Sequence, residues 1–192
     1  LGCEVETNAI AGSSTVRLAY TLQQDLIRFK QEGRVPDKVI LQLTDWVRTG
    51  TFSLDNEYDI CLNINSSPNN EKRVRDFFSA WYNIESEQDM ILRYLHHWVM
   101  IKHIVKSLTG NDPIYVDSIY ELHIEDLLKK VKHPAQISLL DELGWNNFDR
   151  SLSMSFYHDD DADYVHPGLH LSEPVHERFA KSLAEKIKNG LL

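Results

Sequence analysis

Cysteine is scarce in this chain, which carries only Cys3 and Cys61 among its 192 residues. Two thiols cannot build the disulfide framework of a small secreted domain. Their separation also does not match the close pairs of cysteines that bind zinc. A reducing compartment is the simpler inference, and we expect a cytoplasmic protein.

Long apolar runs and an excess of positive charge are missing as well. No run reaches the roughly 20 apolar residues of a membrane-spanning helix. Lys and Arg number 20 against 29 Asp and Glu, which gives a net charge of −9. Because nucleic-acid phosphates are bound by clustered basic side chains, this balance argues against a nucleic-acid partner. We therefore expect neither membrane insertion nor nucleic-acid binding.

The first third of the chain has the pattern of an α/β fold. Residues 3–7 are expected to form a short strand, followed by a turn of small residues at 8–15. The apolar spacing then predicts a helix that stops at Gly33. The run at 38–44 is almost continuously apolar and predicts a buried parallel strand. Strand, helix and strand make a βαβ unit, and with no repeat or linker we expect one domain over 1–192.

The rest of the chain predicts more helices than strands. Residues 45–70 lack clean periodicity, so we expect an ordered loop there. The remaining expected elements are a helix over 72–108 broken near 83–86, an interior strand at 114–118, a helix at 121–131, an irregular or helical segment at 139–148 and a final helix ending near 188.

A loop before that final helix gathers titratable side chains. Residues 159–176 hold five carboxylates and three histidines. Such a loop suits a catalytic histidine beside a carboxylate that orients it. Two plainer interpretations stay open, a solvated surface loop and an adventitious metal site. The metal site would use His158, Asp159, Asp161 and Asp163, but no zinc-type spacing supports it, and we assign no metal ligand.

Two further segments are candidates for binding. Main-chain N–H groups at Gly12 and Ser13 could bind an anion at the start of the helix. The alternative is that these residues only turn the chain and cap the helix. Thr44 ends the strand at 38–44, and Asp45 and Arg48 follow it, at the strand end where ligands bind in open α/β sheets. There the alternative is ordinary loop structure, with Asp45 capping a turn and Arg48 in a surface ion pair.

Together these segments resemble the SGNH (GDSL-like) hydrolase family, especially the branch common in bacteriophage genomes. The segment 8–14 resembles its second signature block, and 39–45 resembles its third. The resemblance implies a flavodoxin-like three-layer α/β/α sandwich with a mostly parallel sheet and no cofactor. It also implies that the Gly12 N–H helps to form an oxyanion hole. Gln42-Leu43-Thr44-Asp45 replaces the family's Gly-x-Asn-Asp, so Thr44 stands where the oxyanion asparagine belongs.

The last family block fits in two registers. Asp163 and His166 have the Asp-x-x-His spacing and are followed by Pro-Gly. His170 and His176 have the spacing that the family shows between its catalytic histidine and a histidine on the next helix. In this register, however, Pro167 occupies the position of the family's aspartate. The resemblance therefore implies that Asp163 orients His166 as the catalytic base, with His170 as the alternative base.

The family's first block, Gly-Asp-Ser, does not occur. The resemblance thus implies a domain that lacks its first strand and its catalytic serine, with Ser13 or Ser14 as an alternative nucleophile. The expected function is hydrolysis of acyl esters, including carbohydrate esters, with Arg48 on the substrate side. The alternative is a non-catalytic binding or virion-associated module of the same fold.

Overall fold

A computed structural model gives the structure of the chain, and it describes residues 4–7, 15–43, 46, 49–53, 58–62, 76, 79–80, 83–117, 123–157, 164–165 and 170–192. The α-helices in this part are α1 (Thr15–Gln31), α3 (Glu87–Thr109), α4 (His123–Lys130), α5 (Pro134–Leu143) and α6 (Glu173–Lys188). The strands are β1 (Ile40–Gln42), β2 (Thr49–Ser53), β3 (Tyr58–Leu62), β4 (Ile114–Val116), β5 (Tyr164–Val165) and β6 (His170–Leu171). Short 3-10 turns follow α5, namely η1 (Trp145–Asn147), η2 (Arg150–Leu152) and η3 (Met154–Tyr157).

The parallel sheet in the described residues consists of β1 and β4. Ile40 lies opposite Ile114 and Gln42 opposite Val116, and the Leu43 N–H continues the pairing by donating to the Val116 carbonyl at 2.8 Å. A single parallel bridge joins Asp117 to Ser153 beyond β4. The other two pairs, β2 with β3 and β5 with β6, are antiparallel hairpins.

The predicted flavodoxin-like three-layer sandwich with a mostly parallel sheet is therefore wrong. The described chain is mostly helical, and its parallel pair has three residues in each strand. Within the apolar run at 38–44, residues Ile40–Gln42 do pair in parallel, but the strand is not buried on both faces, because Leu41 is buried while Ile40 is 44% exposed. With so little strand, the apolar surface that forms the core comes chiefly from helices.

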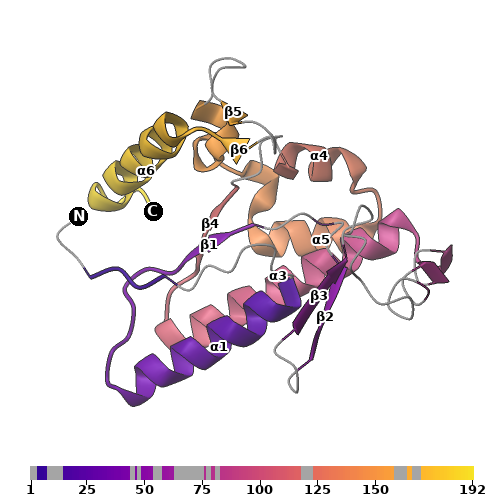
Figure 1. Ribbon diagram of the computed structural model, residues 1–192, viewed down its shortest axis with the longest axis horizontal. Helices are drawn as coiled ribbons and strands as arrows, with labels where there is room; N and C mark the ends of the chain where they lie inside the picture. Colours follow the sequence, from indigo (N-terminus) through magenta and orange to yellow (C-terminus); the bar gives the residue numbers. More distant parts are fainter. Residues whose placement is uncertain are drawn as a thin grey trace.

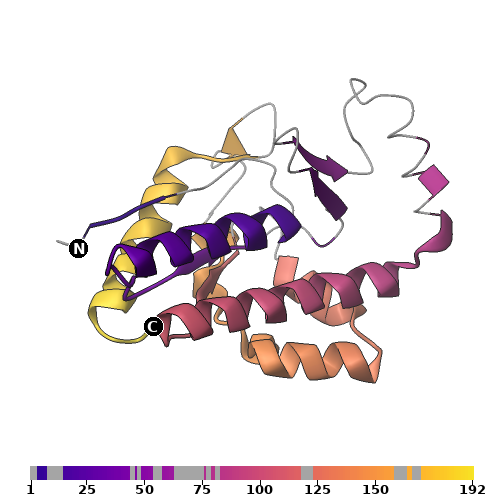
Figure 2. The ribbon, with the colours of Figure 1, turned by 90° about the horizontal axis from the view of Figure 1, so that it is seen from below.

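Helix α3 is the centre of that core. Its first turn carries a capping box, in which Ser86 and Asp89 satisfy one another's main-chain N–H groups. Its fully buried side chains recur every three or four residues, so one face is apolar along its whole length. They are Ile91, Leu95, Trp98, Ile101 and Val105. Both α1 and α5 pack against α3, which Figure 2 shows between them.

The two faces of β4 contact different helices. The Tyr115 side chain belongs to the core built on α3, whereas Ile114 and Val116 belong to a second buried cluster. That cluster includes Val175 and Phe179 of α6, which lies apart from α1 and α3 in Figure 1. The carboxyl end of β4 thus lies between two packed clusters.

Several local predictions are confirmed. The first long helix ends before Gly33 and α3 ends at Gly110, both with positive φ. The break near 83–86, the strand at 114–116 and the helices at 123–130 and 173–188 are also present. No helix in the described part has the length and apolar character needed to span a bilayer.

Two local predictions are wrong. The segment 45–70, expected to be a loop, contains the β2–β3 hairpin. The expected first strand is absent over 4–7, where the chain is irregular. There Glu6 pairs with Arg28 at 2.7 Å and Glu4 pairs with Arg34 at 3.5 Å. Charged side chains, not a strand partner, hold this segment to α1 and the turn after it.

Candidate functional site

A cavity lies at the carboxyl end of β4, between α4 and the turns η1 and η2. Its volume is about 190 Å³. Because parallel strands direct their carboxyl ends to one edge of a sheet, ligands commonly bind there. The described residues that line the cavity are Asp117, Ile124, Glu125, Leu128, Asn146, Phe148, Arg150 and Ser153.

Asp117 is the residue directly after β4, and it is completely buried. Its carboxylate accepts a hydrogen bond from the Ile124 N–H at 3.3 Å, in the first turn of α4. Its main chain is held on both sides, by the Leu152 carbonyl at 2.9 Å and the Met154 N–H at 2.6 Å. A helix N-terminus favours a nearby negative charge, so α4 helps to stabilise this buried carboxylate.

The lining of the cavity also contains a buried hydroxyl and an ion pair. Ser153 is 1% exposed, and its Oγ lies 2.8 Å from the Ser155 Oγ. Arg150 on η2 pairs with Glu125 on α4 at 2.7 Å, and both side chains reach solvent at the rim. This pair ties the two elements that enclose the cavity.

Most of the predicted site residues lie outside the described residues. They are Gly12, Ser13, Thr44, Asp45, Arg48, Asp163 and His166, together with Ser14 and the alternative metal ligands His158, Asp159 and Asp161. His170 is described only in its main chain, which pairs with Val165 in the β5–β6 hairpin. Within the described ranges, no three His, Cys, Asp or Glu side chains gather as a metal site.

Two chain neighbours of the predicted residues are each linked to Val116, the last residue of β4. Leu43, directly before Thr44, is buried and hydrogen-bonds Val116. Leu171, directly after His170, belongs to the same buried cluster as Val116 and Met154. Figure 1 shows β6 beyond the carboxyl end of β4. Of the three predicted segments, the one after β1 and the loop before α6 are therefore each joined to a residue linked to Val116.

The segment after β1 has one more anchor. Trp46 is 8% exposed and packs in the core built on α3. The Lys130 ammonium lies 4.7 Å from the centre of its ring, a cation–π contact with the last residue of α4. The chain between Thr44 and Arg48 is thus fixed at its midpoint to the helix that lines the cavity.

The sequence-based prediction of the site missed the residues of the cavity itself. Asp117 falls within the predicted interior strand at 114–118, and no sequence pattern marks Asn146, Arg150 or Ser153. A usable signal was present, because Asp117 is a charged residue directly after the apolar run Ile114–Val116. The rule that indicated Thr44 and Asp45 applies to it equally.

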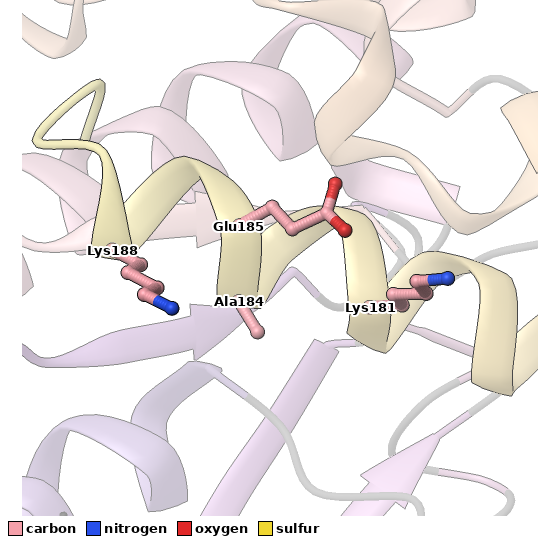
Figure 3. Close-up of a pocket in the computed structure, with 4 residues that line it drawn as sticks. All are labelled: Lys181, Ala184, Glu185 and Lys188. Atoms are coloured by element: carbon pink, nitrogen blue, oxygen red, sulfur yellow. The ribbon is translucent and has the colours of Figure 1, made fainter. Parts of the chain in front are cut away.

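A larger cavity, of about 310 Å³, lies against α6 and carries no comparable chemistry. The described residues that line it are Lys181, Ala184, Glu185 and Lys188 (Figure 3). They share one face of a single helix, and the three charged side chains are exposed. No buried polar group lines it among the described residues, so we assign no site there.

Two of the histidines of α3 contact other helices. The Nδ1 of His97 lies 3.0 Å from the Oγ1 of buried Thr15, at the start of α1. Burial lowers the pKa of His97, and the charges of Arg93 and His96 lower it further. His103 lies on the surface, 3.8 Å from Glu142.

Comparison with known proteins adds no assignment. The resemblance to SGNH hydrolases rests on the sequence blocks alone, and the sandwich that it implied is not the observed architecture. No protein-family model, curated protein or solved structure matches the chain.

Proposed function

We propose that this protein hydrolyses acyl esters of a polar alcohol, with His166 or His170 as the general base. The observation that carries the proposal is the convergence at the carboxyl end of β4. Leu43, directly before Thr44, donates its N–H to the Val116 carbonyl, and Leu171, directly after His170, belongs to the same buried cluster as Val116. This arrangement supports an oxyanion donor and a base acting on the same bound ester, although their sequence positions are far apart.

The proposed reaction is ordinary acyl transfer. A serine hydroxyl attacks the ester carbon while the histidine takes its proton, and Asp163 orients and stabilises the resulting imidazolium. The Gly12 N–H and the Thr44 hydroxyl donate hydrogen bonds to the tetrahedral oxyanion. The histidine then returns the proton to the leaving alcohol, and water releases the acyl group by the same steps. Within this chain, Ser13 and Ser14 are the candidate nucleophiles.

The assay compares acetyl and butyryl esters of a methyl glycoside, using the full-length natural protein. His166→Ala and His170→Ala are made separately, and the base is the one whose loss lowers kcat by roughly 10²–10⁴-fold. His103→Ala is the matched control, because this exposed histidine lies on α3 beside Glu142. The same assay on Ser13→Ala and Ser14→Ala identifies the nucleophile if it is either of them.

The outcome that contradicts the proposal is a folded protein with no ester hydrolysis, or with activity unchanged in both histidine variants. A folded but inert protein would instead favour the non-catalytic binding module that the sequence leaves as the alternative.

A further inference from the structure

We propose that His133, the residue at the N-cap of α5, is a pH-sensitive cap: its neutral imidazole holds the first turn of the helix, and protonation releases that turn. The inference concerns a conformational change and does not depend on the proposed ester hydrolysis. Serine, threonine, asparagine and aspartate are the usual N-cap residues, and none of them changes charge near neutral pH. A histidine differs from them, because imidazole ordinarily gains its second proton between about pH 5 and 8.

The hydrogen bond at this cap requires a neutral ring. The Ala135 N–H donates to the His133 Nδ1 at 3.2 Å. Because a main-chain N–H can only donate, Nδ1 must offer a lone pair, and the ring proton is then on Nε2. A proton that binds Nδ1 takes this lone pair and turns the acceptor into a second donor. The charged ring therefore cannot accept from Ala135.

The surrounding charges also disfavour a charged ring at this position. The charged side chains on the elements that meet at this turn are Glu87 and Asp89 in the first turn of α3, Asp126, Lys129 and Lys130 in α4, and Lys132 directly before the cap. Among the described residues, no carboxylate lies within ion-pair distance of His133, because Glu87 and Asp126 instead pair with Lys130 at 3.0 and 3.4 Å. The positive end of the helix dipole adds to the repulsion. Since the ring is exposed, its charged form can turn into solvent.

The cap belongs to a network of hydrogen bonds that joins three helices. The His133 N–H donates to the Gln136 Oε1 at 3.1 Å, so the two residues cap one another. The Gln136 Nε2 donates to the Gln88 carbonyl on α3 at 2.9 Å. The Gln88 Nε2 in turn donates to the Lys130 carbonyl at the end of α4 at 3.1 Å.

In this network of described residues, His133 supplies the side chain that titrates near neutral pH. Lys130 takes part through its main-chain carbonyl, and the two glutamines do not titrate. Gln136 lies in the first turn of α5, so the amide that fastens α5 to α3 is weakened when this turn opens. Acidification thus loosens the start of α5 at its junction with α3 and α4.

The test is amide hydrogen exchange of the full-length natural protein, followed by NMR at about pH 7.5 and about pH 5.5 and corrected for the intrinsic effect of pH on exchange. We expect the protection of Ala135, Gln136 and Ile137 to fall about threefold to tenfold at the lower pH, as loss of a cap predicts. The fall should exceed any change at Leu95 and Ile101, whose amides in α3 report opening of the core.

The imidazole nitrogen resonances of His133 give a second measurement on the natural protein. At the higher pH they should show the proton on Nε2 and a lone pair on Nδ1, as the bond from Ala135 requires. A proton on Nδ1 at that pH would contradict the capping bond. Because both measurements use the natural protein, they decide the proposal even if a variant folds poorly.

Three variants test the role of the side chain. His133→Asn keeps an acceptor at the cap but does not titrate, so it should retain the protection and lose its dependence on pH. His133→Ala removes the acceptor and should lower the protection equally at both pH values. His103→Asn is the matched control and should keep the full dependence, because this exposed histidine lies beside Glu142, away from the cap.

Three results would overturn the inference. They are equal protection of Ala135, Gln136 and Ile137 at the two pH values, a fall that His133→Asn retains in full, and a fall of the same size at Leu95 and Ile101. These measurements use no ester substrate, so failure of the cap proposal and failure of the esterase proposal are observed separately.

Discussion

The Gln136 side chain joins α5 to α3 by donating a hydrogen bond from its Nε2 to the main-chain carbonyl of Gln88 at 2.9 Å. Its Oε1 accepts from the N–H groups of Lys132 and His133, both at 3.1 Å. Gln136 is 1% exposed, so water cannot replace these three bonds easily. One amide thus caps the start of α5 and fixes it to the central helix.

The first prediction concerns that amide. Gln136→Ala leaves two N–H groups and one carbonyl without their partner, which should lower the free energy of unfolding by about 2–4 kcal/mol. Urea denaturation measures the loss. Ser138→Ala, at an exposed position of the same helix, is the control and should change stability by less than about 0.5 kcal/mol. Equal effects of the two substitutions would show that the amide contributes nothing specific.

The second prediction is a dependence of stability on pH through His97. Burial lowers the pKa of this histidine in the folded state below its ordinary value of 6.5. Between the two pKa values the unfolded state binds more protons, so stability rises with pH through this window and falls as the pH drops through it. The loss is complete once the pH lies below the folded-state pKa.

The measurement is urea denaturation at a series of pH values from about 5 to 8. His97→Asn should flatten the rise, since asparagine does not titrate yet still offers Thr15 a hydrogen-bonding group. His103→Asn, at a surface position of the same helix, is the control and should leave the His97 contribution intact. A profile that His97→Asn does not flatten would contradict the assignment.

The third prediction compares two tyrosine hydroxyls. Tyr115 is buried among the rings of Trp98 and Trp145, and its hydroxyl has no hydrogen-bond partner in the described structure. The Tyr157 hydroxyl bonds both the Ser151 carbonyl at 3.0 Å and the Ser182 Oγ at 2.7 Å. Removing an unbonded buried hydroxyl should cost nothing, whereas removing a bonded one has a cost.

Tyr115→Phe should therefore leave the free energy of unfolding unchanged or raise it by about 1 kcal/mol, and Tyr157→Phe should lower it by about 1–2 kcal/mol. Thermal or urea denaturation of both variants checks the sign. If Tyr115→Phe destabilises the protein as much as Tyr157→Phe, the Tyr115 hydroxyl has a partner such as an internal water.

Local signals in the sequence predicted the helix ends well, because those ends depend on neighbouring residues. Gly110 adopts a φ of +80°, which glycine reaches without the steric cost that other residues have, and it ends α3 as expected. Ser172 stands at the N-cap of α6 for similar reasons, although its hydroxyl makes no capping bond. Such features need no knowledge of the rest of the fold.

The layer architecture could not be predicted from local signals. It depends on which faces of each strand and helix are covered by other elements of the fold. The run containing Ile40 and Leu41 looked suitable for burial on both faces, yet only Leu41 is buried. The sequence does not predict the β2–β3 hairpin, because the residues between its strands, 54–57, contain no glycine to mark a tight turn. Periodicity alone does not say what a strand packs against.

In the candidate site, too, local features could be predicted from the sequence and contacts between distant segments could not. The sequence predicted a site at Thr44, Asp45 and Arg48, which lie outside the described residues, whereas the described cavity lies at the carboxyl end of β4. The sequence did not indicate that Asn146, Arg150 and Ser153 would line that cavity, because they come from turns that only the packing of α4 and α5 brings to the strand end. Contacts between segments so far apart are set by the whole fold.

The last prediction tests the structural part played by Asp117, apart from any ligand. Its carboxylate receives the Ile124 N–H, so Asp117→Ala should leave that N–H unsatisfied and create a cavity beside it. The expected loss is about 2–3 kcal/mol in the free energy of unfolding. Asp117→Asn keeps an acceptor oxygen of nearly the same shape and should lose less than half as much. If alanine and asparagine are equally destabilising, the negative charge is what stabilises the start of α4, through its interaction with the helix dipole.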